Sequence, residues 1–246
     1  MLKGAPRRLT VLDYGLFRVN AGRTIGICGY LIETDAGERV LVDTGFPQKY
    51  ADDGARAAEE DLLGAFGKVL VCGPENMPAG QLATMGLGIR DIALLVMTHT
   101  HIDHVGHLDG FPGVPIVIGA AERALPKPLY WGDVRPMDWP DAEYREIDAD
   151  TVIGPGLTLI SAPGHAPGQL SLLVELPETG AVLLTGDAIS RPAEVAEGFA
   201  GTADRETAVA SAARLLEIAA EREAFVIYGH DPAQWSTLRK APDSYH

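Results

Sequence analysis

The sequence predicts one mixed α/β domain that spans residues 1–246. Three observations lead to this prediction. Short apolar runs bounded by turn-forming residues recur along the whole chain, as expected for strands. The segment 204–220 has the spacing of apolar residues that is typical of an amphipathic helix. No linker-like stretch separates the two halves, and 246 residues are enough for one large domain with a substantial core.

The composition excludes several classes of protein. The chain has 20 Lys and Arg against 34 Asp and Glu, a net charge of −14, which argues against nucleic-acid or anionic membrane partners. No apolar stretch approaches the roughly 20 residues of a transmembrane helix, and the basic N-terminus lacks the apolar region of a signal peptide. The only cysteines, Cys28 and Cys72, do not form a disulfide framework, so we expect a cytoplasmic protein with two small, buried or half-buried thiols.

The elements of the first half follow from local patterns. Residues 9–12 and 16–19 read as one strand or a hairpin, interrupted at 13–15. A second hairpin is predicted from its turn at 35–38, which separates apolar runs at 30–34 and 39–42. A short helix at 52–63 and a helical turn at 81–85 precede the fully apolar run 92–97, which indicates a buried strand.

The second half repeats the pattern of strands followed by helical material. Strands are predicted at 115–118, 157–160, 170–174, 182–185 and 224–228, with a helical turn at 120–124. The helix at 204–220 should begin with Thr202 or Asp204 as its N-cap and bury Val209, Ala212, Leu216 and Ala219. The segment 126–140 holds four prolines, which exclude a regular helix. Its large side chains, Tyr130, Trp131, Met137 and Trp139, could form either a small core beneath a loop or the wall of a substrate pocket.

A cluster of metal-ligating side chains directly follows the buried strand at 92–97. His99, His101 and His104 lie with Asp103 within six residues. Because alternate residues of a strand point the same way, His99 and His101 should leave the strand on one side. Neutral imidazole and carboxylate together suit zinc, and also iron, cobalt or manganese. A histidine-rich polar loop without a metal is the alternative, and this density of ligands favours the metal site.

Three further donors, His165, Asp187 and His230, also follow predicted strands. Loops at strand ends are where catalytic groups concentrate. Seven nitrogen and oxygen donors exceed the four ligands of one tetrahedral zinc, so they predict two ions that share a carboxylate. Asp43, at the end of the run 39–42, is interpreted either as a turn cap or as the acceptor for the free N–H of a metal-bound histidine. His107 is expected to lie outside the ligand set.

The pattern His99-x-His101-x-Asp103-His104, followed by His165, Asp187 and His230 and preceded by Asp43-Thr44-Gly45, resembles the metallo-β-lactamase superfamily. The resemblance implies a four-layer αββα sandwich with the metals at one edge between two sheets. It further implies that His99, His101 and His165 hold one ion, that Asp103, His104 and His230 hold the other, and that Asp187 bridges them. The ligand set differs from that of the zinc β-lactamases, because it includes Asp103 and Asp187 and no cysteine. This difference argues against hydrolysis of β-lactam antibiotics.

Within the superfamily, the segments 163–168, 186–188 and 228–231 look most like the N-acyl-homoserine lactonases, which degrade quorum-sensing signals. This resemblance implies a small lactone or ester substrate and a homodimer. Those enzymes usually carry a tyrosine three residues after the bridging aspartate, where it contacts the lactone carbonyl oxygen; this chain has Ser190, whose hydroxyl is too short to reach that point. Another donor such as Tyr130 or Tyr228 could replace it, or the substrate could differ. The candidate substrate-binding residues are Ser190, Tyr130, Trp131 and Trp139.

The expected activity is that of a two-zinc hydrolase that opens a lactone ring. Two ions at about 3.5–4 Å lower the pKa of a shared water towards 7, which allows attack by a bridging hydroxide at neutral pH. Asp103 is the expected catalytic residue, since it could pass a proton to the leaving alkoxide. Hydrolysis of a thioester of the hydroxyacylglutathione type, or of another ester, is the main alternative. An iron centre for oxygen chemistry and a structural metal protein are further alternatives, and the net charge argues against a nuclease.

Overall fold

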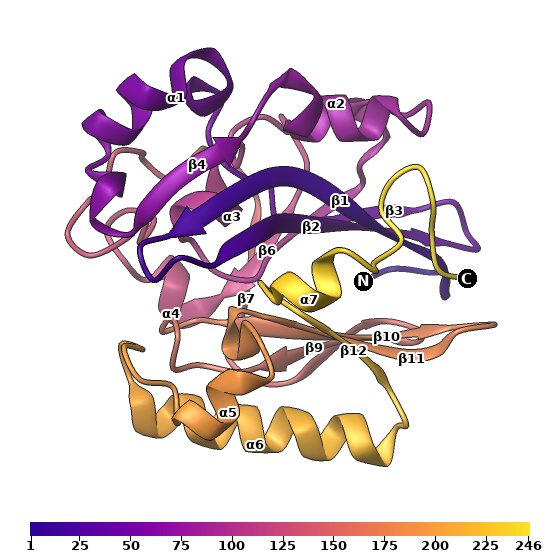
Figure 1. Ribbon diagram of the computed structural model, residues 1–246. Helices are drawn as coiled ribbons and strands as arrows, with labels where there is room; N and C mark the ends of the chain where they lie inside the picture. Colours follow the sequence, from indigo (N-terminus) through magenta and orange to yellow (C-terminus); the bar gives the residue numbers. More distant parts are fainter.

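The computed structural model describes residues 1–246 and contains two β-sheets packed face to face, with helices on both outer faces (Figure 1). The first sheet has seven strands in the order β4-β1-β2-β3-β5-β6-β7, and the second has five in the order β12-β11-β10-β9-β8. This is the αββα arrangement that the resemblance implied. The strands are β1 (Pro6–Val19), β2 (Thr24–Thr34), β3 (Arg39–Val42), β4 (Gly67–Val71), β5 (Leu94–Met97), β6 (Ile116–Gly119), β7 (Tyr144–Ile147), β8 (Thr151–Gly154), β9 (Leu157–Ser161), β10 (Leu170–Leu176), β11 (Gly180–Gly186) and β12 (Phe225–Tyr228).

The helices form the two outer layers. In Figure 1, α1 and α2 cover the outer face of the first sheet, and α6 lies along the outer face of the second. None of the helices combines the length and the apolar character needed to cross a bilayer. The helices are α1 (Lys49–Glu60), α2 (Pro78–Ala83), α3 (Ile102–Val105), α4 (Ala120–Arg123), α5 (Ala193–Glu197), α6 (Arg205–Glu221) and α7 (Pro232–Trp235), with short 3-10 turns η1 (Leu63–Ala65), η2 (Pro74–Asn76), η3 (Ile89–Asp91) and η4 (Asp187–Ile189).

Three apolar clusters hold these layers together. The central cluster joins the facing sides of both sheets, for example Val42 and Val96 of the first sheet with Leu172 and Leu184 of the second. Each fully buried aliphatic side chain of this kind contributes about 1.5–3 kcal/mol relative to an exposed one. A second cluster lies between the first sheet and its helices, and a third lies between the second sheet and α6. The sandwich therefore has one core between the sheets and one under each helical layer.

Strand direction determines which loops meet at the edge of the sandwich. Strands β3, β5 and β6 pair in parallel, so that the carboxyl ends of β3 and β5 lie side by side. In the second sheet, β11 and β12 also pair in parallel. The loops that follow β3, β5, β11 and β12 carry most of the polar residues identified from the sequence.

Residues 9–19 belong to one strand, β1, which is one of the two predicted alternatives; its pairing with β2 is irregular between Asp13 and Leu16. Other local predictions were wrong. Strands β4, β7 and β8 were missed because much of their surface is exposed and their apolar patterns are weak. In α6, Val209 is 45% exposed. The buried face is displaced by one residue at two positions, since both sets of residues satisfy helical spacing; it comprises Ala208, Ala212, Leu215 and Ala219. Asp204 is the N-cap, because its side chain accepts a hydrogen bond from the Thr207 amide.

Candidate metal centre

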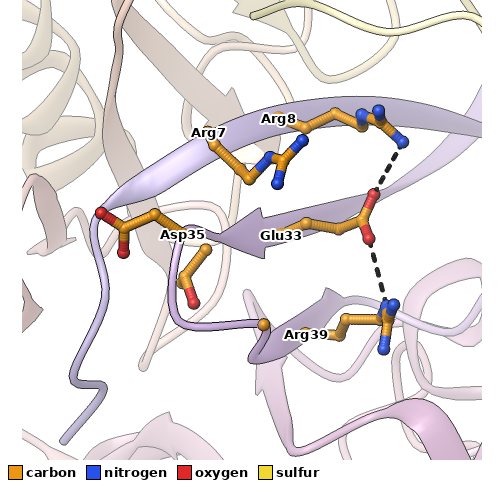
Figure 2. A pocket seen from close by; sticks show the side chains of 7 residues that line it. Arg7, Arg8, Glu33, Asp35 and Arg39 are labelled. Carbon is orange, nitrogen blue, oxygen red and sulfur yellow. Dashed lines mark hydrogen bonds and ion pairs between the residues drawn. The ribbon is translucent and has the colours of Figure 1, made fainter.

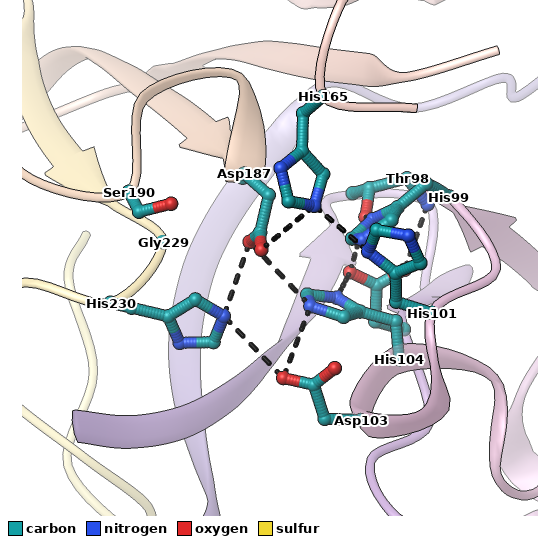
Figure 3. Close-up of polar contacts among 12 residues, drawn as sticks. Thr98, His99, His101, Asp103, His104, His165, Asp187, Ser190, Gly229 and His230 are labelled. Carbon is teal, nitrogen blue, oxygen red and sulfur yellow. Dashed lines mark hydrogen bonds and ion pairs between the residues drawn. The ribbon is translucent and has the colours of Figure 1, made fainter. Parts of the chain in front are cut away.

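The seven predicted donors converge at one edge of the sandwich (Figure 3). The loop after β5 and the start of α3 supply four of them from the first sheet. The loop after β9 and the ends of β11 and β12 supply the other three from the second sheet. They form three groups, each with its ligand atoms within 4.8 Å of one another: His99, His101 and His165; His99, His104 and Asp187; and Asp103, His104 and His230.

Asp187 lies between the histidines at the centre of this arrangement. Its Oδ1 is 3.2 Å from Nε2 of His230 and 3.5 Å from Nε2 of His104. Its Oδ2 is 3.4 Å from Nε2 of His165, which is in turn 2.8 Å from Nδ1 of His101. Each oxygen of Asp187 therefore faces a different part of the histidine cluster, as a carboxylate shared between two positions must.

Neighbouring acceptors determine which ring nitrogen of three histidines faces the site. Nδ1 of His230 lies 2.9 Å from the carbonyl oxygen of Gly26, and Nδ1 of His99 lies 3.1 Å from the hydroxyl of Thr98. That hydroxyl donates its only proton to Asp43, so it accepts the N–H of His99. With Nδ1 protonated, Nε2 is left with a free lone pair. Nε2 of His99 is buried and has no hydrogen-bond partner, as expected for a nitrogen whose partner is a metal ion.

Asp43 fixes His104 in the same way. Its Oδ2 lies 2.8 Å from Nδ1 of His104 and 2.7 Å from the Thr98 hydroxyl, while its Oδ1 accepts from the Thr98 amide at 2.8 Å. Asp43 adopts a φ of +58°, a conformation that aspartate tolerates better than most residues. Nε2 of His104 is left buried and without a hydrogen-bond partner. The side chain therefore holds the free N–H of a cluster histidine, which is one of its two predicted roles.

The electrostatics divide the histidines into two sets. Burial lowers the pKa of His99, His101 and His165, and neighbouring histidines lower it further. Burial also acts to lower the pKa of the other two, but nearby carboxylates outweigh it: Asp103, Asp187 and Asp43 raise the pKa of His104 to about 10, and Asp187 with Asp103 raises that of His230 to about 9. Burial acts to raise the pKa of Asp187, yet His230 and His104 hold it well below its usual range. Without a metal, the cluster is a set of neutral imidazoles beside a carboxylate–imidazolium network.

A cavity of about 570 Å³ opens onto the donors. Its floor includes His101, Asp103, His165, Asp187 and His230, and eleven of its twenty lining residues are hydrophobic. No lysine or arginine lines it. Most of the wall was not identified from the sequence, because its members come from distant segments and have no distinguishing local pattern: Phe17, Ile25, Phe46, Leu63 and Phe66.

The four predicted substrate-binding residues have different positions. Trp131 lines the cavity, with its ring 4.6 Å from that of Phe66. Tyr130 also lines it, but its hydroxyl donates to the buried Asp61 at 3.1 Å. Trp139 and Ser190 are not among the residues that line the cavity, and their contact with a substrate stays a prediction. The indole of Trp139 donates to the carbonyl of Leu125, and its ring packs against the core between the first sheet and its helices.

Two other residues considered from the sequence also lie outside the centre. Tyr228, considered as a replacement donor, packs against the α6 core and is not part of the cavity lining. The ring of His107 lies 3.1 Å from the sulfur of Met77 and belongs to none of the donor groups, as expected.

A second depression, of about 180 Å³, has a different character (Figure 2). It lies where β3 begins, at the opposite end of that strand from Asp43. Glu33 ion-pairs with both Arg8 and Arg39 there, at 3.2 and 3.1 Å. No hydrophobic residue lines it. Its arginines are therefore partly neutralised, and it contributes nothing to the metal centre.

The sandwich and its donor cluster define a class of protein, and sequence comparison identifies the same class. Residues 29–230 match the family model of the metallo-beta-lactamase superfamily. The chain belongs to this superfamily.

Its relatives include enzymes that hydrolyse lactones. The chain is 32% identical over 221 residues to the N-acyl homoserine lactonase AiiA of Bacillus thuringiensis subsp. kurstaki, with 87% of this chain and 84% of the relative covered. It is 33% identical over 181 residues to the N-acyl homoserine lactonase AttM of Rhizobium radiobacter, with 67% and 68% covered. Among solved structures, an N-acyl homoserine lactone hydrolase with N-hexanoyl-L-homoserine bound at its catalytic metal centre is similar with a TM-score of 0.84 and 26% identity, covering 98% and 100% of the two chains.

Proposed function

We propose that this protein is a two-zinc hydrolase that opens the ring of N-acyl-homoserine lactones or similar lactones. The observation that carries the proposal is the convergence of seven donors, five of which line a largely apolar cavity. The identity to named lactonases over most of the chain supports the choice of substrate.

The residues fit a pair of metal ions. His99, His101 and His165 would hold one ion, Asp103, His104 and His230 the other, and Asp187 would bridge them. The buried, unpartnered Nε2 atoms of His99 and His104 support this, because an unsatisfied buried nitrogen is costly unless a ligand binds it. Zinc is the ion proposed, since it combines imidazole and carboxylate ligands readily. When bound, a zinc pair supplies an ionised water and polarises the substrate carbonyl.

Two aspartates support this chemistry from different positions. Asp43 keeps the Nε2 lone pair of His104 directed into the site by accepting its Nδ1 proton. Asp103 lies at the floor of the cavity, with Oδ2 3.5 Å from Nε2 of His230 and a side chain 18% exposed. Its carboxylate is the group placed to receive a proton at the reacting centre and deliver it to the alkoxide that leaves when the ring opens.

The cavity wall supports an apolar acyl chain as the rest of the substrate. A volume of about 570 Å³ lies within the usual range for small-molecule sites. Glutathione thioesters carry several charged groups, and no lysine or arginine lines the cavity to pair with their carboxylates. We therefore place the thioester hydrolase second to the lactonase.

The test is a pH-stat screen of the zinc-loaded protein against homoserine lactones of increasing acyl length, aliphatic lactones and glutathione thioesters. We expect turnover of the acyl-homoserine lactones and two zinc ions per chain by elemental analysis. An Asp103→Asn variant that still binds two ions should lose about 10²–10⁴-fold in kcat. Thioester turnover without any lactone turnover would overturn the proposed substrate, and a protein that binds no metal would overturn the proposed class of reaction.

A further inference from the structure

Glu122 is a completely buried carboxylate that belongs to neither the donor cluster nor the cavity wall. It lies in α4, where its exposed fraction is 0%. No lysine, arginine or histidine forms an ion pair with it. Burying a carboxylate costs folding free energy unless hydrogen bonds compensate for the lost hydration, so the hydrogen-bond partners of Glu122 indicate its role.

Those partners belong to the two loops that carry His99, His101 and His165. Oε1 accepts hydrogen bonds from the amide and the hydroxyl of Thr100, at 2.9 and 2.5 Å. Thr100 stands between His99 and His101 in the chain. Oε2 accepts from the amide of Gly168, at 3.2 Å, three residues after His165. One carboxylate therefore connects the ligand loop of the first sheet to a ligand loop of the second.

Glycines allow these segments to approach so closely. A Cβ on Gly168 would lie 2.5 Å from the backbone nitrogen of Glu122. A Cβ on Gly119, at the end of β6, would lie 2.1 Å from the carbonyl oxygen of Gly168. Both distances are far below van der Waals contact, so only glycine fits at either position without displacing the loop. The contact between α4 and the loop of His165 is therefore tight and specific.

The Thr100 hydroxyl extends the connection to the cavity wall. Besides donating to Glu122, it accepts a hydrogen bond from the amide of Leu129 at 2.7 Å. Leu129 and the two residues after it line the cavity. The carboxylate thus anchors the ligand loops directly and the wall through one intermediate hydroxyl.

We propose that Glu122 is a positioning residue for the ion held by His99, His101 and His165. By fixing the loop of the first two histidines relative to the loop of the third, it presents the three nitrogens at the separation that one ion requires. This inference rests on the proposed function, because it assumes that the triad binds a metal.

The substitution Glu122→Gln tests the role with little change in shape. Thr100 and Gly168 both present donors, and a carboxylate can accept from all of them. A glutamine offers one oxygen and one NH₂ group, so the NH₂ must face an N–H or O–H donor in one of the two loops. Removing such an outer partner of metal ligands typically weakens metal binding about 10–100-fold. Glu33→Gln is the control, because Glu33 also accepts from two groups but lies in β2 beside the start of β3, away from the metal centre.

The experiment measures the two stepwise zinc dissociation constants by chelator competition for the native protein and both variants. Cadmium-113 NMR, assigned with a His101→Ala variant, identifies the ion that is lost first. We expect Glu122→Gln to weaken the three-histidine ion at least 10-fold, to change the other ion less than 3-fold, and to speed amide exchange at Thr100 or Gly168 in the metal-free protein. Glu33→Gln should leave both constants unchanged.

Two results would overturn the positioning role: unchanged constants in Glu122→Gln, or equal weakening of both ions. If Glu122→Gln fails to fold, Thr100→Val removes the hydroxyl that bonds to Glu122 and to the Leu129 amide while keeping the β-branched shape, and the same outcomes decide. A native protein that binds no metal would instead refute the proposed function. The two failures are therefore distinguishable.

Discussion

Replacing Asp43 with Asn tests whether a carboxylate controls the metal-binding tautomer of His104. The variant keeps an oxygen for the Thr98 amide but substitutes an NH₂ group for the oxygen that accepts from His104 and from the Thr98 hydroxyl. Asn tolerates the positive φ of this position as well as Asp does, so backbone strain should not contribute. The expected consequence is confined to the hydrogen bonds of one oxygen.

The magnitude follows from those bonds. A hydrogen bond to a charged group contributes about 1.5–3 kcal/mol, so the metal-free variant should lose about that much free energy of unfolding. If the NH₂ group donates to Nδ1, the proton of His104 moves to Nε2 and blocks the ligand position. We therefore expect zinc affinity to fall about 10–100-fold, equivalent to about 1.4–2.8 kcal/mol.

Urea unfolding of the metal-free protein, chelator competition and ¹⁵N NMR of the imidazoles measure these effects. Asp13→Asn is the matched control, because that half-buried aspartate accepts a backbone amide proton from Gly15 and contacts no histidine. Native zinc affinity in Asp43→Asn, with Nδ1 of His104 still protonated, would refute the reasoning.

Three other predictions concern protons, the cavity and the backbone. The raised pKa values of His104 and His230 keep both protonated at about pH 7 in the metal-free protein, so zinc binding should release about two protons from these histidines, in addition to the one from the ionised water, and the histidine contribution should disappear as the pH rises through about 9 to 10; calorimetry in buffers of different ionisation enthalpy measures this, and release of no proton at neutral pH would contradict it. Trp131→Ala removes the contact with Phe66, and should raise KM for long-chain lactones about 10-fold with little effect on short ones; an equal change for both would be inconsistent with an acyl-chain wall. Gly164 has a φ of +134° and packs against the backbone of α6, so Gly164→Ala should cost at least about 1–3 kcal/mol of stability, measured by thermal unfolding, and an unchanged melting temperature would be evidence against this strain.

The metal donors could be found from the sequence because their positions are local and chemically distinctive. His99, His101, Asp103 and His104 stand together after a buried strand, and the remaining donors each follow another strand end. The pairing of the strands then brings these ends together. The same logic located α6 and most strands of both sheets, since long or strongly apolar segments are recognisable from their local pattern, whereas the arrangement of the strands in two sheets came from the family resemblance.

The cavity and the supporting carboxylate depend on tertiary contacts that leave no such pattern. Trp131 and Trp139 look equivalent in a proline-rich loop, yet Trp131 lines the cavity whereas the indole of Trp139 donates to the carbonyl of Leu125. Glu122 reads as an ordinary surface charge on a short helix. It is buried only because Gly119 and Gly168 allow a distant loop to lie directly against it.

Each of the three donor groups takes two members from the first sheet and one from the second. An ion bound by any of these groups would cross-link the two sheets, because neither sheet alone supplies all three donors. The sheets could then separate only if the ion were released, so the free energy of metal binding would add to the free energy of unfolding. The heat resistance of this sandwich should consequently follow the supply of free metal around it.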